Sequence, residues 1–533
     1  MQNRACLLLA CSFVLSTFTW AAEAPARTCA SLKQLALPNV SITIAQPVAA
    51  GMFVPPNLKS DEKIPPLYKA TPAFCRVSAT LSPTSDSDIK VEIWMPASGW
   101  NGKFRGLGNG GFAGYIAYSG LAEAVTQGYA AASTDTGHST EGADWALGHP
   151  EKVIDYGFRA VHEMTVDAKT VVKSFYGDAA KKSYFASCSN GGRQALMEAQ
   201  RFPEDYDGIL AGAPANAWVP LLTGALKFVQ TLDQAGYIPP AKIPAISKAV
   251  LAACDELDGL NDGVINDPRQ CRFDASILRC KGKESDACLT GSQVDSLKLI
   301  YSGVRDASGK QLFPGMLPGA EDGDGGWKDW ITGSEEGKSA GVFFVNGFFR
   351  NMVYGQKDWD FRHAKIDASL KLAYEKTGDA MDAMSPDLKP FLARGGKLIL
   401  YHGWNDPAIS ALNTVNYYNN VMAAVGRQSV DESVRLYMVP GMQHCDGGPG
   451  ATSFGQRDTK PRSDPEHDIF TSLVEWVEND TAPGSLIATK YGEGHPAKVE
   501  MTRPLCPYPQ AVKYKGTGDP NLAASFVCTS GDE

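Results

Sequence analysis

The stretch YFASCSNGGRQALMEAQRFPEDYDGILAGAP, residues 184–214, decides the fold of this chain. Lys182–Cys188 is short, largely apolar and ends in small residues, as a buried strand does, and a helical pattern begins near Arg193. Ser189 lies in the sharp turn between them, in a Ser-x-Ser-x-Gly version of the nucleophile elbow. A strained turn that exposes a hydroxyl leaves room only for small neighbours. The stretch therefore predicts an α/β fold with Ser189 as a nucleophile, against the alternative of a plain turn with an incidental serine.

A glycine-rich loop, GNGGFAG at residues 108–114, follows a predicted strand in Trp100–Leu107. Backbone at such a loop comes close to a ligand, and in the α/β-hydrolase architecture this loop donates one oxyanion N–H. A dinucleotide loop is the competing interpretation, but the spacing is not G-x-G-x-x-G. His138 follows the next predicted strand, Tyr129–Ser133. We expect it to order its loop, because it precedes Ser189 whereas the α/β-hydrolase order is Ser, acid, His.

Two further buried strands are predicted near the carboxyl end of the chain. Residues 395–403 are followed by Asp406, and residues 433–440 are followed by His444. Catalytic groups gather beyond the carboxyl ends of parallel strands, so Ser189, Asp406 and His444 should meet. His444 would take the proton of Ser189 and Asp406 would orient the imidazole. His402 belongs to the same layer and is a weaker candidate base.

The length and composition of the chain indicate a large exported protein with an inserted domain. At 533 residues it exceeds the roughly 250–300 residues at which single cores stop growing. Residues 215–384 are irregular, aromatic-rich and contain four cysteines, as an inserted lid domain would. We therefore expect hydrolase-domain parts at 23–214 and 385–533. The net charge of -9 argues against nucleic acid and anionic membranes as partners.

Residues 1–22 have the pattern of a secretory signal peptide. Arg4 provides the positive region, an apolar run extends from Ala5 to Phe18, and small residues follow at Ala21 and Ala22. The apolar run is too short to span about 30 Å of hydrocarbon as a membrane anchor. A lipoprotein cleavage box ending at Cys11 is a minor alternative. The mature protein is expected to be secreted or periplasmic.

Ten cysteines remain once the signal peptide is removed, an even number that should pair in an oxidising compartment. Many connectivities are open. Cys188 and Cys445 adjoin Ser189 and His444, so contact between those two would bring the cysteines within reach of a disulfide. No C-x-x-C or histidine-rich pattern predicts structural zinc. Local spacing favours the pairs Cys254 with Cys271, Cys280 with Cys288, Cys506 with Cys528, and Cys29 with Cys75.

The acidic segment CDELDGLNDGVI, residues 254–265, is the sharpest feature of the expected lid. Asp255, Asp258 and Asp262 alternate with glycines beside a predicted disulfide, and oxygen ligands of this kind suit calcium. The spacing is not that of an EF-hand, and a solvated acidic turn is the alternative.

The combination of Cys188-Ser189, Asp406 and His444-Cys445 resembles the pattern of the tannase and feruloyl esterase family. The likeness extends through residues 101–114, 182–215, 254–266, 397–407, 436–450 and 503–521, which are spread over nearly the whole mature chain. It implies an α/β-hydrolase fold with a large inserted lid domain, a secreted serine esterase, and a disulfide joining nucleophile and base. It further implies the following site residues: oxyanion N–H groups from Gly111 and Asn190, calcium ligands Asp255, Asp258, Asp262 and the carbonyls of Leu260 and Val264, and pocket residues Trp330 and His402.

The same motifs also resemble the mono(2-hydroxyethyl) terephthalate hydrolases of this family. In those enzymes a lid arginine pairs with the free carboxylate of the substrate, whereas Gly341 occupies that place here, and Arg350 is the only cation nearby. The sequence therefore predicts hydrolysis of feruloyl- or galloyl-type aromatic esters, with calcium and no organic cofactor. The alternatives are a terephthalate monoester hydrolase and, in another class, an exported binding protein without chemistry.

Overall fold

The structure, a computed structural model, describes residues 27–56, 58, 62–456, 464–492, 494 and 497–530. The predicted signal peptide at residues 1–22, with Cys11, lies outside the described residues. Within the described part, no helix is both long enough and apolar enough to span a bilayer.

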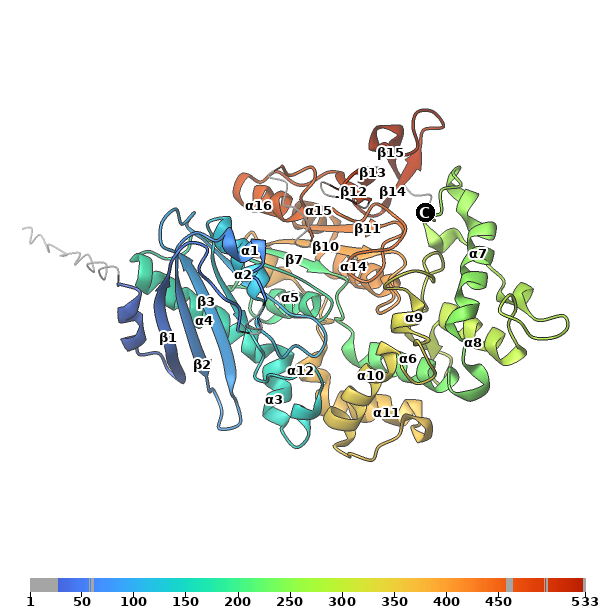
Figure 1. Cartoon of the computed structure of the whole chain (residues 1–533), viewed down its shortest axis with the longest axis horizontal. Coiled ribbons are helices and arrows are strands. Elements are labelled where there is room, and N and C mark those ends of the chain that lie inside the picture. Colours follow the sequence, from blue (N-terminus) through green and yellow to red (C-terminus); the bar gives the residue numbers. More distant parts are fainter. Residues whose placement is uncertain are drawn as a thin grey trace, which may run out of the picture.

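A nine-stranded sheet runs through the centre of the molecule (Figure 1), in the order β1-β2-β3-β5-β4-β6-β7-β10-β11. The pairs from β1 to β5 are antiparallel, and those from β5 to β11 are parallel. The parallel half brings several carboxyl strand ends to one edge, where polar groups can meet. The strands are β1 (Val40–Val48), β2 (Phe74–Leu81), β3 (Ile89–Pro96), β4 (Lys103–Leu107), β5 (Ala130–Thr134), β6 (Lys182–Cys188), β7 (Gly208–Gly212), β10 (Lys397–Gly403) and β11 (Val434–Val439).

Helices cover both faces of this sheet. One buried apolar cluster joins the sheet to α4 (Ala160–Tyr176), α5 (Asn190–Arg201) and α14 (Ala411–Val425). A second joins the opposite face to α2 (Tyr118–Thr126) and α16 (Ile469–Asn479). Helices on both faces of a largely parallel sheet define the α/β class, and the prediction of an α/β-hydrolase fold is confirmed.

The region between β7 and β10 is mostly helical and lies to one side of the sheet, coloured green to yellow in Figure 1. Part of it has an apolar core of its own, made of residues between 228 and 331. Another cluster joins it to residues 112–156 of the sheet region, so the two parts pack together. Its helices include α6 (Trp218–Thr231), α7 (Ile243–Cys254), α8 (Gly291–Ser302), α9 (Trp327–Trp330), α10 (Ala340–Val345), α11 (Ile366–Ala373), α12 (Asp379–Met381) and α13 (Lys389–Ala393).

Two hairpins complete the fold beyond α16. They pair β12 (Leu486–Tyr491) with β13 (Val499–Leu505), and β14 (Gln510–Tyr514) with β15 (Phe526–Ser530). All five predicted disulfides are present, which confirms the pairing inferred from local spacing and from the two motif cysteines. They are Cys29–Cys75, Cys188–Cys445, Cys254–Cys271, Cys280–Cys288 and Cys506–Cys528.

Candidate active site

Ser189 occupies a strained turn between β6 and α5. Its backbone has φ +67° and ψ -126°, in the left-handed region that side chains rarely adopt. A Cβ on Gly191 would lie 1.8 Å from Ser187 Oγ, and one on Gly192 would lie 2.3 Å from the carbonyl oxygen of Gly212. Only glycine fits at both positions, which is the physical reason for the small residues seen in the sequence.

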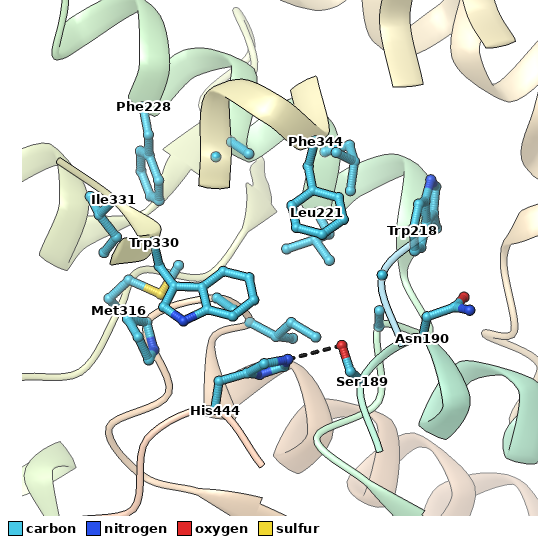
Figure 2. A pocket seen from close by; sticks show the side chains of 18 of the residues that line it. Ser189, Asn190, Trp218, Leu221, Phe228, Met316, Trp330, Ile331, Phe344 and His444 are labelled. Atoms are coloured by element: carbon cyan, nitrogen blue, oxygen red, sulfur yellow. Dashed lines mark hydrogen bonds between the residues drawn. The ribbon is translucent and has the colours of Figure 1, made fainter. Parts of the chain in front are cut away.

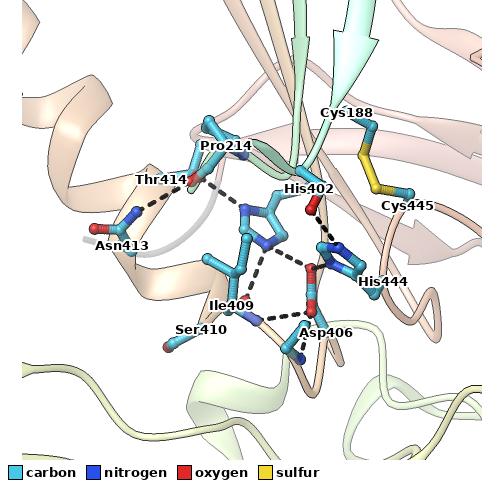
Figure 3. A network of polar contacts seen from close by, with 12 residues as sticks. Cys188, Pro214, His402, Asp406, Ile409, Ser410, Asn413, Thr414, His444 and Cys445 are labelled. Carbon is cyan, nitrogen blue, oxygen red and sulfur yellow. Dashed lines mark hydrogen bonds and ion pairs between the residues drawn. A yellow bond between two sulfur atoms is a disulfide. The ribbon is translucent and has the colours of Figure 1, made fainter. Parts of the chain in front are cut away.

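Asp406 and His444 follow the carboxyl ends of β10 and β11, and both reach the elbow (Figure 3). His444 Nδ1 lies 2.7 Å from Asp406 Oδ2, and His444 Nε2 lies 2.9 Å from Ser189 Oγ. The three residues therefore form a continuous hydrogen-bonded chain, which the order of the motifs in the sequence predicts. The geometry matches a nucleophile, a base and an orienting carboxylate.

Asp406 is fully buried, and its environment favours the ionised form. Burial alone would raise the pKa of this carboxyl, but the charges and hydrogen bonds of His444 and His402 hold the pKa below its usual range. The other carboxylate oxygen accepts hydrogen bonds from the backbone N–H groups of Ala408 and Ile409, at 2.8 and 2.9 Å. A carboxylate held in this way stabilises a protonated imidazole.

His402 does not line the apolar cavity that opens beside Ser189, which corrects the implication drawn from the family resemblance. Its imidazole is fully buried behind Asp406, with Nε2 3.0 Å from Asp406 Oδ2 and Nδ1 2.7 Å from Thr414 Oγ1. Its ring nitrogens are thus engaged away from Ser189. His402 supports the carboxylate and is in no position to act as the base.

The disulfide between Cys188 and Cys445 directly links the nucleophile turn to the histidine loop (Figure 3). The two Cα atoms lie 6.1 Å apart. Cys445, like Ser189, has a positive φ, at +65°. The covalent link therefore holds two strained turns against each other, one residue away from each reacting side chain.

Gly111 and Asn190, for which the family resemblance implies oxyanion N–H groups, lie close to the elbow. Both line the cavity that also contains Ser189 and His444. Asn190 is the first residue of α5, where backbone N–H groups have no partner within the helix. The N–H of Gly111 donates to no protein atom in the described part of the chain. Two free N–H groups beside a serine hydroxyl are suited to hold a developing negative charge.

An apolar cavity extends from Ser189 beneath the helical region (Figure 2). Trp330 on α9 packs edge-on against the ring of His444 with a centroid distance of 4.8 Å, and Phe344 on α10 lies parallel to Trp330. The apolar spacing along α6 is the signal in the sequence from which this wall could have been predicted. The side chains of the wall come mainly from α6, α9 and α10 and the loop after β10: Trp218, Leu221, Leu222, Phe228, Val229, Met316, Trp330, Ile331, Phe344, Pro407 and Ile409.

A second, more polar groove meets the cavity at the same serine. Its wall includes Arg105, Glu123, Asp324 and Gln443. The residues common to both spaces are Gly111, Ser189, Trp330, Phe344 and His444. The Ser189 hydroxyl thus lies between an apolar chamber and a polar groove.

Gly341 and Arg350, the two positions considered for binding a free carboxylate, line different depressions. Gly341 lines the apolar cavity beside Ser189, whereas Arg350 lines a different depression with Asn346 and Trp359. Among the cavity-lining residues there is no lysine, arginine, aspartate or glutamate. The cavity therefore offers no cation for a carboxylate.

The acidic segment fits a cation at two of its three carboxylates. Asp255 Oδ1 and Asp258 Oδ2 are buried without a hydrogen-bond partner. Burial, then the neighbouring Asp262 and Asp255 charges, raise the pKa of Asp258 to about 6. Asp262 differs, because its Oδ2 pairs with Arg503 at 2.7 Å and its Oδ1 accepts from the N–H of Val264. The N–H of Leu260 binds Asp258.

A separate cluster of His162, Glu198 and Asp205 lies between α4 and α5. Among the described residues it is the one group of three such side chains whose ligand atoms all lie within 4.8 Å of one another. His162 Nδ1 is 2.6 Å from Asp205 Oδ2, which is a direct hydrogen bond. Burial, then the charge of Asp205, raises the pKa of Glu198 well above its ordinary value. Both carboxylate oxygens of Glu198 are buried without a hydrogen-bond partner among the described residues.

The sheet topology and the elbow define an α/β-hydrolase. Comparison with known proteins then gives the family. Residues 75–529 match the model for "Tannase and feruloyl esterase". An uncharacterized esterase of Xanthomonas campestris pv. campestris is 40% identical over 94% of this chain and 91% of that protein. A probable feruloyl esterase B of Aspergillus clavatus is 32% identical over 94% of this chain and 95% of that protein.

Two solved structures are similar to this chain over most of its length. Feruloyl esterase B from Aspergillus oryzae superposes with a TM-score of 0.85 at 28% identity, covering 94% of this chain and 99% of the other. The tannin acyl hydrolase from Aspergillus niger shares the fold, with a TM-score of 0.73 at 21% identity and 94% coverage of each chain. This chain belongs to the tannase and feruloyl esterase family, and it is a carboxylic ester hydrolase.

Proposed function

We propose that the protein is an exported serine esterase that hydrolyses esters of aromatic acids through Ser189, His444 and Asp406. The observation that carries the proposal is the hydrogen-bonded chain of these three residues at the mouth of an apolar cavity. Export is supported by five disulfides, which persist in oxidising compartments.

The proposed reaction has two steps. His444 Nε2 takes the proton of Ser189 as Oγ attacks the ester carbonyl, and the N–H groups of Gly111 and Asn190 hold the oxyanion. His444 returns the proton to the leaving alcohol, which leaves an acyl-enzyme. Water then attacks this ester with His444 again as base, and His444 returns that proton to Ser189 Oγ as the bond between the acyl carbon and Oγ breaks and the acid departs. Asp406 stabilises the imidazolium in both steps.

The two spaces that meet at Ser189 favour one orientation of the substrate. We assign the acyl group to the apolar cavity and the alcohol to the polar groove. A cinnamoyl or feruloyl ring would pack between Trp330 and the aliphatic side chains of α6. A galloyl ring would bury three hydroxyls against apolar groups, and each unpaired hydroxyl costs about 1–3 kcal/mol. Feruloyl-type acids are therefore preferred over galloyl acids.

The terephthalate monoester is a less favoured substrate. Its free carboxylate would enter a cavity lined by Gly341 and by no charged acidic or basic side chain. An unpaired ion in such surroundings is costly. We expect a neutral aromatic ester of the same size to be hydrolysed faster than the monoester.

A structural calcium ion in the helical region is part of the proposal. The partnerless oxygens of Asp255 and Asp258 support it, together with the backbone carbonyls of Leu260 and Val264 as further ligands. Asp262 would join only by sharing its carboxylate with Arg503. When bound, the ion would neutralise these carboxylates.

The test combines labelling with turnover. Wild type and Ser189→Ala are treated with a fluorophosphonate and assayed on methyl cinnamate, methyl ferulate, methyl gallate and mono(2-hydroxyethyl) terephthalate. We expect labelling of the wild type only, and a loss of turnover in Ser189→Ala by orders of magnitude. Ester hydrolysis by purified Ser189→Ala within tenfold of wild type would refute the mechanism. Absence of labelling and of turnover in the wild type would favour a binding protein.

A further inference from the structure

The hydroxyl of Tyr156 bridges the two residues assigned to the oxyanion hole. Its oxygen lies 2.8 Å from the carbonyl oxygen of Gly111 and 3.1 Å from Asn190 Oδ1. Tyr156 comes from the π-helical turn η3 (Asp155–Arg159), far from both residues in sequence, and is fully buried. One phenolic proton is thus directed at both halves of the hole.

Other hydrogen bonds hold Asn190 and Tyr156 in place around this hydroxyl. Asn190 is already oriented by Arg193, whose Nε donates to Asn190 Oδ1 at 2.8 Å, and by the carbonyl of Asn109, which accepts from Asn190 Nδ2 at 3.1 Å. Arg193 also donates to the backbone carbonyl of Tyr156 at 3.1 Å, and its guanidinium lies over the Tyr156 ring, 5.0 Å from the centroid. Burial holds the pKa of Tyr156 above its usual range, so the hydroxyl keeps its proton and remains a donor.

The glycine loop receives a second buried donor at the next carbonyl. His138 Nε2 lies 2.6 Å from the carbonyl oxygen of Phe112, and its ring stacks on Trp145. Burial lowers the pKa of His138 to about 4, so the neutral ring donates through Nε2. Two consecutive carbonyls, of Gly111 and Phe112, are therefore each held by a side chain from elsewhere in the fold.

These contacts bear directly on the direction of the Gly111 N–H. Gly111 has φ +59°, and a residue without a Cβ has more backbone freedom than any other. The preceding peptide is tied once, through the Gly110 carbonyl to the N–H of Ala113 at 2.9 Å. Without side-chain donors, the peptides on either side of Gly111 would turn easily.

We propose that Tyr156, assisted by His138, is a positioning residue that aims the Gly111 N–H at the oxyanion and couples it to the start of α5. The proposal rests on the function proposed above. Neither side chain lines the cavity or the groove that meet at Ser189, so both would act through the backbone donors. Loss of one oxyanion donor costs about 10²–10³ in rate, and a misaimed donor should cost less, about 10- to 100-fold.

The experiment compares Tyr156→Phe with Tyr176→Phe. Tyr176 is a matched control, because its hydroxyl also donates to a backbone carbonyl at 2.8 Å, that of Pro96, and it lies at the far end of α4. We expect Tyr156→Phe to lower kcat on a methyl ester about 10- to 100-fold with KM changed less than threefold. Tyr176→Phe should keep kcat within twofold of wild type.

An inhibitor pair separates positioning from general damage. Ser189 adds to a trifluoromethyl ketone and forms an oxyanion. The product acid forms no bond to Ser189 and develops no new oxyanion. The affinity of Tyr156→Phe for the ketone should fall by the same factor as kcat/KM, while its affinity for the acid stays within twofold of wild type. His138→Phe should show the same pattern with a smaller factor.

A folded Tyr156→Phe enzyme with wild-type kcat would overturn the proposal. Should that variant not fold, a folded His138→Phe enzyme with wild-type kcat and ketone affinity would do so. A wild-type enzyme that hydrolyses none of the esters would instead refute the function, so the two failures are told apart within one assay.

Discussion

The double substitution Cys188→Ala with Cys445→Ala tests what the disulfide between nucleophile and base contributes. In the folded protein this bond joins residues adjacent to Ser189 and His444, whose reacting atoms lie 2.9 Å apart. Both flanking turns have a positive φ, at Ser189 and at Cys445. Removing the bond releases two strained loops from each other at the point where proton transfer must occur.

The structure allows both effects to be estimated. The closed loop spans 257 residues, for which the chain-entropy model gives about 5.5 kcal/mol of stabilisation. That figure is an upper bound, because four other disulfides and a large core remain. For the rate, a displacement of about 1 Å at a catalytic group costs roughly a hundredfold. We expect kcat to fall 10- to 100-fold in a protein that still unfolds cooperatively.

The assay measures kcat on a methyl ester beside thermal unfolding, with Cys280→Ala, Cys288→Ala as the control. That pair closes a loop of only 8 residues within the helical region, worth about 2.5 kcal/mol in the same model. The control should lose stability but keep kcat within twofold of wild type. A folded Cys188→Ala, Cys445→Ala protein with wild-type kcat would refute the catalytic role of the bond.

Two further predictions concern stability. Excess chelator should lower the melting temperature by several degrees and calcium should restore it, since a ligand at 1,000 times its Kd adds about 4 kcal/mol to the free energy of unfolding. Asp258→Asn should remove this response, and identical melting curves with and without chelator would exclude the site. Glu198 has a raised pKa in the fold, so its contribution to stability is complete below its ordinary pKa of 4.5 and is lost as pH rises through the folded value. Each unit of that difference lowers the unfolding free energy at high pH by about 1.4 kcal/mol. Glu198→Gln should therefore match wild type near pH 4.5 and be more stable at pH 9 by urea unfolding, whereas an equal pH dependence in both proteins would contradict the raised pKa of Glu198.

Much of the fold and of the site could be predicted from the sequence because the signals are local. The strand at Lys182–Cys188 has the predicted bounds, since apolar composition followed by glycines constrains a strand and a turn at once. The glycines at 191 and 192 are required by contacts below 3 Å that no Cβ could satisfy. Ser189, Asp406 and His444 meet because each follows a strand of the parallel half of the sheet, and the carboxyl ends of those strands lie at one edge.

Long-range placement was not available from the sequence. The position of β5 between β3 and β4 depends on which strands pair, and no local pattern encodes that. His402 belongs to the same strand end as Asp406, yet its ring turns into the core to bind Thr414, because a buried imidazole requires partners for both nitrogens.

The sequence by itself determined the elbow, the motifs at Asp406 and His444 and the cysteine pairs that lie close together along the chain, because each depends on residue type and short spacing. Only the tertiary structure decided what surrounds them. Tyr156 reaches Gly111 and Asn190 from a separate helical turn, and Asp262 turns to Arg503 in a C-terminal hairpin. Contacts of this kind arise when distant segments pack against one another, so their geometry exists only in the folded chain.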